Sequence, residues 1–582
     1  MRKSLVLLYA FLIVALPLQA QDATLLLQRI KEVAARPVFR HSTFGVEVYD
    51  VTAQKTLVAI NENQLFTSGS TTKVVTEGVA LALLGADYRF HTRVFYRGNI
   101  TDDGTLDGDL ILVAGGDPNL SGRLLPDDTL DYASRDHAYA GLLPGKSVAG
   151  EPLRVLKELA ANVLMKGIWR IRGNVIVDAS LFPSNQTEPA TRTTISPIIL
   201  NDNVIDVIAT SASSVGGPVS VEVAPDLPYL NVINKVHTGK PDSDPAMQFT
   251  SDVLEADGSH TVILEGSVPA GKDKAQAAYK VKDPVLFAKV GFQEALRWAG
   301  IVMEPPIAAA MPASTPQPEP TENKLIAEHV SPPFKEEVKL TLKVSQNLHA
   351  ATTPYLLGSL LANSSADASQ KGLALERRFL DHARLNPETV SQLDGEGGIG
   401  SAFSPDFIVR YLDFMSRQPY GHLLYESLPV LGRDGTLADT LSDSPAAGHV
   451  HAKTGSYVVA NGLSGGVMLL GKGLAGYLDA RNGHHLIFAV FVNMVPLRNM
   501  DDVSNVGETL SHVAELAYLY APPQPVPQKV SPPNAPQKTP GTKAPPKTTV
   551  AKTPPKTHAP KPARTAARKT AHKAPAHKPA QN

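Results

Sequence analysis

The sequence predicts an α/β (α+β) fold in which both ends of the chain build one domain, an antiparallel sheet flanked by helices, around a large, mostly-β insertion. Three observations lead to this prediction: strand and helix patterns occur together near the start of the chain, they return together near its end, and the middle of the chain changes to short strands and turns. At 582 residues the chain exceeds the ~250 to 300 residues at which single cores stop growing, so several lobes are expected.

The first part of the sheet domain is expected over residues 21–88. Alternation around a turn in "FGVEVYDVTAQKTLVAIN" (44–61) predicts a β-hairpin. After Ser70, "VVTEGVALALLG" is apolar on a helical period and ends at Gly85, which suits a C-terminal cap. Thr67 and Ser68 carry hydroxyl groups at the point where that helix begins, and we expect them to form its entry and cap.

The insertion is expected over residues 89–320, where stretches such as "GNVIVDASLF" predict short strands, and "MPASTPQPEPTEN" (311–323) predicts a linker. The second part of the sheet domain should then occupy 321–520. There "NGLSGGVMLL" and "HHLIFAVFVNM" predict adjacent antiparallel strands, and "GETLSHVAELAYLY" predicts a closing helix.

Both termini differ from this body. Residues 1–20 combine Arg2, Lys3, an apolar run and small residues near Ala20, which predicts a secretory signal peptide; an uncleaved anchor is the alternative. Residues 521–582 hold 12 Lys and Arg, no acidic residue and 16 of the 47 prolines, so we expect a disordered basic tail. The tail is either a passive spacer or a contact to anionic envelope polymers or a membrane surface; nothing indicates nucleic-acid binding.

The composition excludes several classes of chemistry, and two short motif matches lack the structural context that their functions require. The chain has no cysteine, so disulfides, thiol catalysis and thiolate zinc sites are excluded, and we expect no cofactor and no metal. "GEGGIG" (395–400) matches a dinucleotide fingerprint, but no buried strand precedes it. "GLSGG" (462–466) matches a nucleophile elbow, but a strand rather than a helix follows, which makes Ser464 an ordinary strand or turn residue.

The stretch "STTK" places Ser70 and Lys73 three residues apart on one face at the start of a helix. A lysine beside an apolar face and near other cations or polar groups can lose its proton readily enough to accept one from a serine. The helix N-terminus adds partial positive charge near that oxygen. Taken alone, Ser-x-x-Lys is common by chance, and an ordinary capped helix start is the better interpretation.

Two further motifs follow in order. "SQN" contains Ser345 and Asn347, and "KTGS" contains Lys453, Thr454, Gly455 and Ser456. Each motif by itself could be a cap or a turn. The order Ser-x-x-Lys, Ser-x-Asn, Lys-Thr-Gly is the signature of penicillin-binding proteins and serine β-lactamases.

From about Phe44 to Tyr520 the chain resembles the class C low-molecular-mass penicillin-binding proteins, the D-alanyl-D-alanine carboxypeptidase/endopeptidase group of peptidase family S13 (penicillin-binding protein 4-like). "GDLILVAGGDPNLS", "GNVIVDASLF", "INKVHTG", "HVSPPFKE" and "LPVLGRDGTLADTL" are similar to family segments. The long separation of Ser70 and Ser345 is also typical of this family, which inserts extra domains there, whereas class A β-lactamases lack the insertion. Three features depart from the family: Gln346 replaces a common Asp, Ala351 replaces an acidic residue, and "DGEGGIGSAFSP" replaces a loop usually reading Asp-Gly-Ser-Gly-Leu-Ser.

The resemblance implies a β-lactamase/transpeptidase-like fold and acyl transfer on peptidoglycan peptides ending in D-Ala-D-Ala, in the periplasm or cell envelope. Ser70 would attack, Lys73 would take its proton, and Ser345, held near Asn347, would relay that proton to the leaving amine. Backbone N–H groups of Ser70 and Ser456 would form the oxyanion hole, and Lys453, Thr454 and Gly455 would bind the substrate carboxylate.

The same site could cut crosslinks as an endopeptidase, and β-lactams would act as covalent inhibitors. Two alternatives stay open: a β-lactamase or esterase, and an inactive cell-wall-binding scaffold of the same fold. The departures at Gln346, Ala351 and the "DGEGGIG" loop leave the three motifs whole, and they leave substrate preference and turnover rate open.

Overall fold

The computed structural model describes residues 23–141, 145–184, 186–187, 193–271, 274–304 and 323–520. They all belong to one compact unit, Met1–Gln524; a second unit comprises Pro525–Asn582. The expected signal peptide, nearly all of the expected linker and the expected basic tail lie outside the described residues. Among the helices of the described ranges, none combines the length and apolarity that crossing a bilayer requires.

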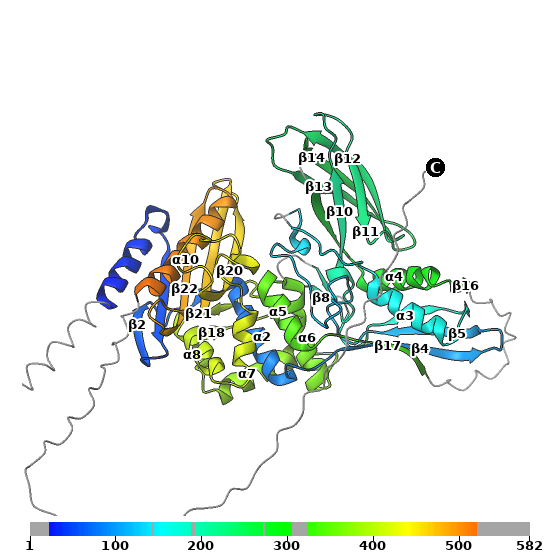
Figure 1. Cartoon of the computed structure of the whole chain (residues 1–582), viewed down its shortest axis with the longest axis horizontal. Coiled ribbons are helices and arrows are strands. Elements are labelled where there is room, and N and C mark those ends of the chain that lie inside the picture. Colours follow the sequence, from blue (N-terminus) through cyan, green and yellow to red (C-terminus); the bar gives the residue numbers. More distant parts are fainter. Residues whose placement is uncertain are drawn as a thin grey trace, which may run out of the picture. The chain divides into compact units, whose positions relative to one another are not determined.

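One five-stranded sheet brings together both ends of the chain, in the order β2-β1-β22-β21-β20, and every neighbouring pair is antiparallel (Figure 1). The two strand pairs that the sequence predicts, β1 with β2 and β21 with β22, are confirmed. The strands are β1 (Thr43–Asp50), β2 (Lys55–Ile60), β20 (Val450–Asn461), β21 (Gly466–Asp479) and β22 (His485–Leu497).

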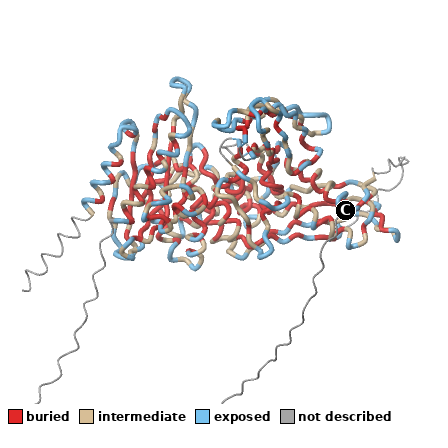
Figure 2. Tube along the Cα trace, turned by 45° about the horizontal axis from the view of Figure 1, so that its top comes forward, coloured by how far each residue is buried: buried red, intermediate tan, exposed pale blue. Residues whose placement is uncertain are grey.

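Both faces of this sheet are buried, which is why β22 is an almost unbroken apolar run. Ile487, Ala489 and Phe491 pack into one core, while Phe488 and Val490, pointing the other way, pack into a second. The second core also contains α10 (Asp501–Tyr520), the expected closing helix, and a helix over residues 23–34. Figure 2 shows buried residues along these layers and exposed residues mainly at outer loops.

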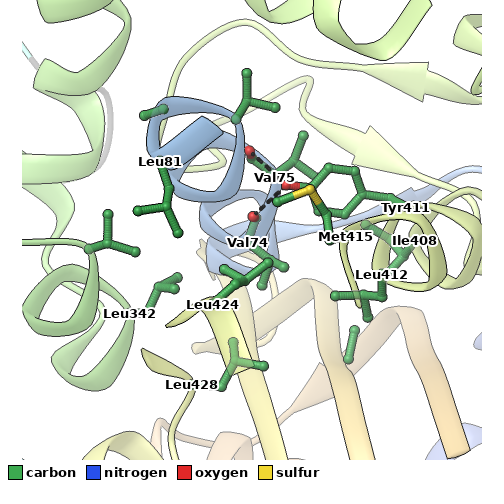
Figure 3. Packing of buried hydrophobic residues seen from close by; sticks show 14 of the residues in the cluster. Val74, Val75, Leu81, Leu342, Ile408, Tyr411, Leu412, Met415, Leu424 and Leu428 are labelled. Carbon is green, nitrogen blue, oxygen red and sulfur yellow. Dashed lines mark hydrogen bonds between the residues drawn. The ribbon is translucent and has the colours of Figure 1, made fainter. Parts of the chain in front are cut away.

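The helices of the first core surround α2 (Thr72–Leu84), whose residues from Thr72 to Leu81 are all buried. Figure 3 shows Val74 and Val75 against α8, where the Tyr411 hydroxyl donates to their carbonyl oxygens. A helix whose residues are buried on every face needs packing partners on every side. The surrounding helices are α5 (Phe334–Val344), α6 (Asn347–Leu361), α7 (Ala368–His382), α8 (Pro405–Ser416) and α9 (Gly421–Ser427).

The sequence predicted the C-terminal end of α2 correctly but not the way in which the helix begins. The helix ends at Gly85 with a φ of 91°, as expected for a C-terminal glycine. The expected capping by Thr67 and Ser68 is wrong: Thr67 lies in β3 (Phe66–Thr67), and Ser68 makes no side-chain cap. A short 3₁₀ turn, Gly69–Thr71, leads into the helix instead, and Thr71 makes no side-chain cap either.

In its described residues, the inserted segment contains four sheets and two α-helices, α3 (Arg154–Met165) and α4 (Pro284–Trp298). Its largest sheet has the order β16-β6-β5-β4-β17, with β7 paired to β5. Because β17 pairs with β4, this sheet continues past residue 320. Its strands are β4 (His91–Ile100), β5 (Thr105–Val113), β6 (Arg170–Arg172), β7 (Val175–Asp178), β16 (Val302–Glu304) and β17 (Lys324–Val330).

Smaller sheets complete the fold. Two three-stranded sheets of the inserted segment consist of β10 (Val204–Thr210), β11 (Ser220–Ala224) and β15 (Ala275–Lys280), and of β12 (Leu230–Gly239), β13 (Ala246–Leu254) and β14 (His260–Pro269). The remaining short strands are β3, β8 (Gln186–Thr187), β9 (Thr194–Ile195), β18 (Val390–Ser391) and β19 (Ala402–Phe403).

Replacing Phe491 tests the core beneath the sheet. Its ring is fully buried and stacks on Phe66, with ring centroids 6.0 Å apart. We expect Phe491→Ala to lower the free energy of unfolding by about 3 to 5 kcal/mol, measured by urea denaturation, because a large cavity remains. Leu463→Ala, at a fully exposed hairpin position, should change it by less than about 0.5 kcal/mol. Equal effects of the two substitutions would contradict this account of the core.

Candidate active site

Ser70 and Lys73 lie at the junction of the 3₁₀ turn Gly69–Thr71 with α2. At the start of a helix, residues three apart lie on the same face. Lys73 Nζ accordingly lies 2.7 Å from Ser70 Oγ, as the spacing predicts. The side chain of Lys73 is fully buried, so its amine is shielded from solvent.

The amine of Lys73 connects three stretches that are far apart in sequence. Besides Ser70, it donates to Asn347 Oδ1 at 2.7 Å and to the carbonyl oxygen of Glu396 at 3.4 Å. The first and second sequence motifs therefore meet at this group.

The second motif forms a tight link between two helices. Ser345 ends α5 in the left-handed conformation, with φ 62° and ψ 36°, and α6 begins at Asn347. Between them, Gln346 caps α6 by accepting a hydrogen bond from the N–H of Leu348. Ala351, the other departure from the family pattern, is a buried core residue of α6.

The third motif runs along β20, beside the 3₁₀ turn. Lys453 Nζ donates to Ser345 Oγ at 2.8 Å and to the Thr454 carbonyl oxygen at 2.9 Å. Thr454 Oγ1 lies 3.0 Å from the hydroxyl of Thr436. All three motifs are thus joined by hydrogen bonds, from Ser70 through Lys73 to Asn347 and from Ser345 to Lys453.

Glycine is required where the 3₁₀ turn and β20 touch. A Cβ on Gly455 would lie 2.1 Å from the carbonyl oxygen of Ser68, and a Cβ on Gly69, which has a φ of 49°, would lie 2.6 Å from the backbone nitrogen of Ser456. This close approach brings the backbones of Ser70 and Ser456 together.

The "DGEGGIG" loop packs against the 3₁₀ turn Gly69–Thr71. The carboxylate of Asp394 accepts hydrogen bonds from the backbone N–H groups of Glu396, Gly397 and Gly398, which fixes the loop. A Cβ on Gly397 would lie 1.9 Å from the carbonyl oxygen of Gly69. The loop has neither a strand before it nor a helix after it that would suit a dinucleotide site.

A sequence model of the D-Ala-D-Ala carboxypeptidase 3 (S13) family matches residues 26–512. The chain belongs to this family. The D-alanyl-D-alanine carboxypeptidase of Actinomadura sp. (strain R39) is 26% identical over 463 residues, 76% of this chain and 78% of the relative. D-alanyl-D-alanine carboxypeptidase DacB of Haemophilus influenzae is 22% identical over 467 residues, 78% of this chain and 85% of the relative.

Solved structures of penicillin-binding protein 4 (dacB) from Haemophilus influenzae share the fold of this S13 protein. One has a TM-score of 0.64 at 19% identity and covers 84% of this chain and 99% of its own. A second, complexed with a β-lactam, has a TM-score of 0.60 at 20% identity with the same coverage. The family, the fold class and the enzyme class that the sequence predicted, a hydrolase of the D-Ala-D-Ala carboxypeptidase type, are confirmed.

Lys472 is a member of the site that sequence reasoning missed. It lies on β21 directly opposite Ser456, and its Nζ donates to Ser456 Oγ at 2.6 Å. Burial lowers the pKa of Lys472 to about 8. Burial also holds the pKa of Lys453 well below its usual range, and the charges of Lys73 and Lys472 lower it further. The sequence could have indicated Lys472 only through the pairing of β20 with β21, because finding the residue opposite Ser456 requires the register of that hairpin.

One group of buried side chains in the described part of this S13 chain has metal-ligand character: Asp136, His137 and Asp202. The guanidinium of Arg123 lies 2.5 Å from carboxylate oxygens of both Asp136 and Asp202, so it already supplies the positive charge that a metal ion would bring to those carboxylates.

Lys472 should make stability depend on pH. Its folded pKa of about 8 lies below the ordinary value of 10.5, so between these values the unfolded chain binds more protons and stability rises with pH. We expect Lys472→Met to raise the free energy of unfolding at pH 7 by about 1 to 3 kcal/mol, and the gain to shrink toward pH 10.5. Chemical denaturation over this pH range measures it.

The matched control for this prediction is Lys235→Met, at an exposed lysine of the inserted segment, which should leave the pH dependence unchanged. A Lys472→Met chain whose stability stays parallel to the wild type at every pH would contradict the low pKa of Lys472.

Proposed function

We propose that Ser70 is the nucleophile of a serine-type D-Ala-D-Ala carboxypeptidase that forms an acyl-enzyme with peptidoglycan stem peptides. The observation that supports it most directly is the 2.7 Å contact between Lys73 Nζ and Ser70 Oγ at a fully buried lysine, joined to the other two motifs. A buried amine beside a serine can accept the proton of the serine hydroxyl and so activate its oxygen as a nucleophile.

In the acylation step, Ser70 Oγ bonds to the carbonyl carbon of the penultimate D-Ala, and its proton passes to Lys73. This transfer requires an uncharged amine. The charges of Lys73 and Lys472 both lower the pKa of Lys453, so the cluster does not readily keep a proton on every amine. Asn347, accepting from Lys73 Nζ, keeps that amine aimed at the serine.

Collapse of the tetrahedral intermediate requires a proton on the leaving amine. Ser345 is suited to relay this proton. Its hydroxyl accepts a hydrogen bond from Lys453 Nζ at 2.8 Å, and it lies two residues before Asn347, which accepts a hydrogen bond from Lys73. The C–N bond then breaks, the terminal D-Ala leaves, and water later hydrolyses the ester on Ser70. We assign no group to the activation of that water.

Two backbone N–H groups, of Ser70 and Ser456, serve as the oxyanion hole in this proposal. The contact of Gly69 with the Ser456 backbone supports it, because a larger residue would separate the two donors. Each donor of this kind contributes about 3 to 4 kcal/mol to the transition state in comparable enzymes.

The substrate's terminal carboxylate is proposed to bind at Thr454 and Gly455 with the charge of Lys453 behind them. Lys453 is fully buried and already donates to Ser345 and to the Thr454 carbonyl, so the Thr454 hydroxyl is the more accessible donor. The same carboxylate position would receive a β-lactam, in keeping with the β-lactam complex of the similar penicillin-binding protein 4.

Labelled penicillin tests the nucleophile. We expect the purified full chain to form a covalent adduct, seen as a band in denaturing gels and as a mass increase on the peptide containing Ser70, and Ser70→Ala to form none. Leu463→Ala, at an exposed site, should label like the wild type. Absence of an adduct from a folded wild-type chain would contradict the acyl-enzyme and favour the inactive scaffold.

The fate of the adduct and of defined muropeptides separates the remaining activities. Rapid release of hydrolysed penicillin would favour a β-lactamase, whereas a long-lived adduct favours a penicillin-binding peptidase. Release of D-Ala from pentapeptides measures carboxypeptidase activity, and cleavage of D-Ala-to-diaminopimelate crosslinks measures endopeptidase activity, which the same site could perform.

Export to the periplasm or cell envelope is proposed from residues 1–20, and attachment from residues 521–582, which carry 12 basic and no acidic residues. Such a segment attracts anionic polymers and lipid headgroups through charge alone.

Truncation tests attachment by the tail. A chain ending at Tyr520 should co-sediment less with sacculi or anionic vesicles than the full chain. Binding of the full chain should fall at about 1 M salt, where the screening length is about 3 Å. Equal retention of both chains would exclude attachment by the tail and leave it a spacer.

A further inference from the structure

A buried array of charged side chains connects the inserted segment to the two helices on either side of Ser345. We call it the junction network. It comprises Arg123, Asp136, His137, Asp202 and Asp206 from the inserted segment and Glu337 and His349 from α5 and α6. None of these residues belongs to the three motifs, and every one of them is buried.

Asp202 is the centre of the junction network. Its Oδ2 lies 2.5 Å from a guanidinium nitrogen of Arg123 and 2.5 Å from His137 Nε2, and its Oδ1 lies 2.9 Å from His349 Nε2. Burial alone would raise the pKa of Asp202, but Arg123, His137 and His349 outweigh it and hold that pKa well below its usual range. The carboxylate is therefore charged and bound on both oxygens.

His349 extends the network to both helices. It lies in the first turn of α6, and its Nδ1 is 3.1 Å from Glu337 Oε1 on α5. Burial lowers the pKa of His349, but Glu337 and Asp202 overcome this and raise it to about 10. At neutral pH the imidazolium thus binds α5, α6 and the inserted segment together.

Two contacts lead from the network to the link between α5 and α6. Gln346 Nε2 donates to Asp136 Oδ1 at 3.3 Å, and the hydroxyl of Tyr139, three residues after Asp136, donates to the Ser345 carbonyl oxygen at 2.7 Å. Ser345 has a left-handed backbone, which a serine adopts only when its surroundings hold it there.

The inserted segment itself is shaped to present Asp202. Asn201, Asp202 and Asn203 all have left-handed φ angles of 49°, 55° and 50°. Asn and Asp tolerate this conformation better than other residues with a Cβ, so the "NDN" sequence suits a turn that aims the central carboxylate at the network.

A buried charge array of this kind is a poor source of net stability, because desolvation offsets most of the attraction between the ions. It is a strict constraint on geometry, because moving any member leaves a charge unpaired. These two properties suit a group that holds a neighbouring segment in one arrangement.

We propose that the junction network makes the inserted segment part of the catalytic apparatus, with Arg123, Asp136, Tyr139 and Asp202 as positioning residues for Ser345. The inference rests on the proton-relay role proposed for Ser345. It assigns the insertion a function in the acylation step, carried through two hydrogen bonds: Tyr139 donates to the Ser345 carbonyl oxygen, and Gln346, inside the Ser345–Asn347 link, donates to Asp136.

The experiment uses the full chain and the second-order rate constant of acylation by labelled penicillin. Tyr139→Phe removes a single hydroxyl and leaves the charges intact, and Arg123→Lys keeps the charge but loses the fork that bridges Asp136 and Asp202. The matched control is Arg135→Lys, in a solvent-exposed ion pair with Asp439 that also connects the insertion to the second part of the chain.

We expect Tyr139→Phe to slow acylation by roughly fivefold to tenfold, the effect of one lost hydrogen bond, and Arg123→Lys to slow it at least as much. Arg135→Lys should acylate at the wild-type rate. Thermal unfolding measured on each variant ensures that rates are compared for folded chains, and Tyr139→Phe keeps the test decisive if Arg123→Lys fails to fold.

Repeating the substitutions in a Ser345→Ala background separates positioning from a merely structural role. If Tyr139 acts through Ser345, Tyr139→Phe should change the already slow rate by less than about twofold, because coupled residues are not additive. An equal loss in both backgrounds, or wild-type rates for Tyr139→Phe and Arg123→Lys, would overturn this inference alone. A folded wild-type chain without Ser70-dependent labelling would instead overturn the proposed function.

Discussion

The site depends on keeping the buried amine of Lys73 within hydrogen-bonding distance of groups from three separate stretches of chain. Ser70 Oγ, Asn347 Oδ1 and the Glu396 carbonyl oxygen all contact it. A buried amine is costly unless its hydrogen bonds are made, so α2, α6 and the loop after Asp394 must be placed together. The apolar packing around α2 fixes the first of these positions, and the Asp394 carboxylate fixes the third.

The second position depends on the insertion. The link that carries Ser345 and Asn347 is short and contains a residue in the left-handed conformation. It forms hydrogen bonds with Tyr139 and Asp136, which both belong to the inserted segment. Gly455 lets the β20 strand contact the 3₁₀ turn that carries Ser70. Apolar packing, buried charge and backbone contact together hold the arrangement.

Sequence reasoning succeeded where chemistry depends on local spacing. The three-residue spacing of Ser70 and Lys73 predicted their contact, the alternation in β1 and β2 predicted a hairpin, and Gly85 predicted the end of α2. It failed at Thr67 and Ser68, because a 3₁₀ turn held by β20 and the "DGEGGIG" loop replaces side-chain capping. Lys472 was missed because its partner depends on strand register.

By itself, the sequence determined the motifs, their order, the two strand pairs and the family that they indicate, since these depend on residue type and short-range period. Only the tertiary structure decided how deeply Lys73 and Lys453 are buried, that Lys472 joins them, and that Asp202 and His349 meet 147 residues apart. The reason is physical: hydrogen bonds and ion pairs between distant segments depend on the relative placement of whole helices and strands, and local sequence carries no measure of that placement.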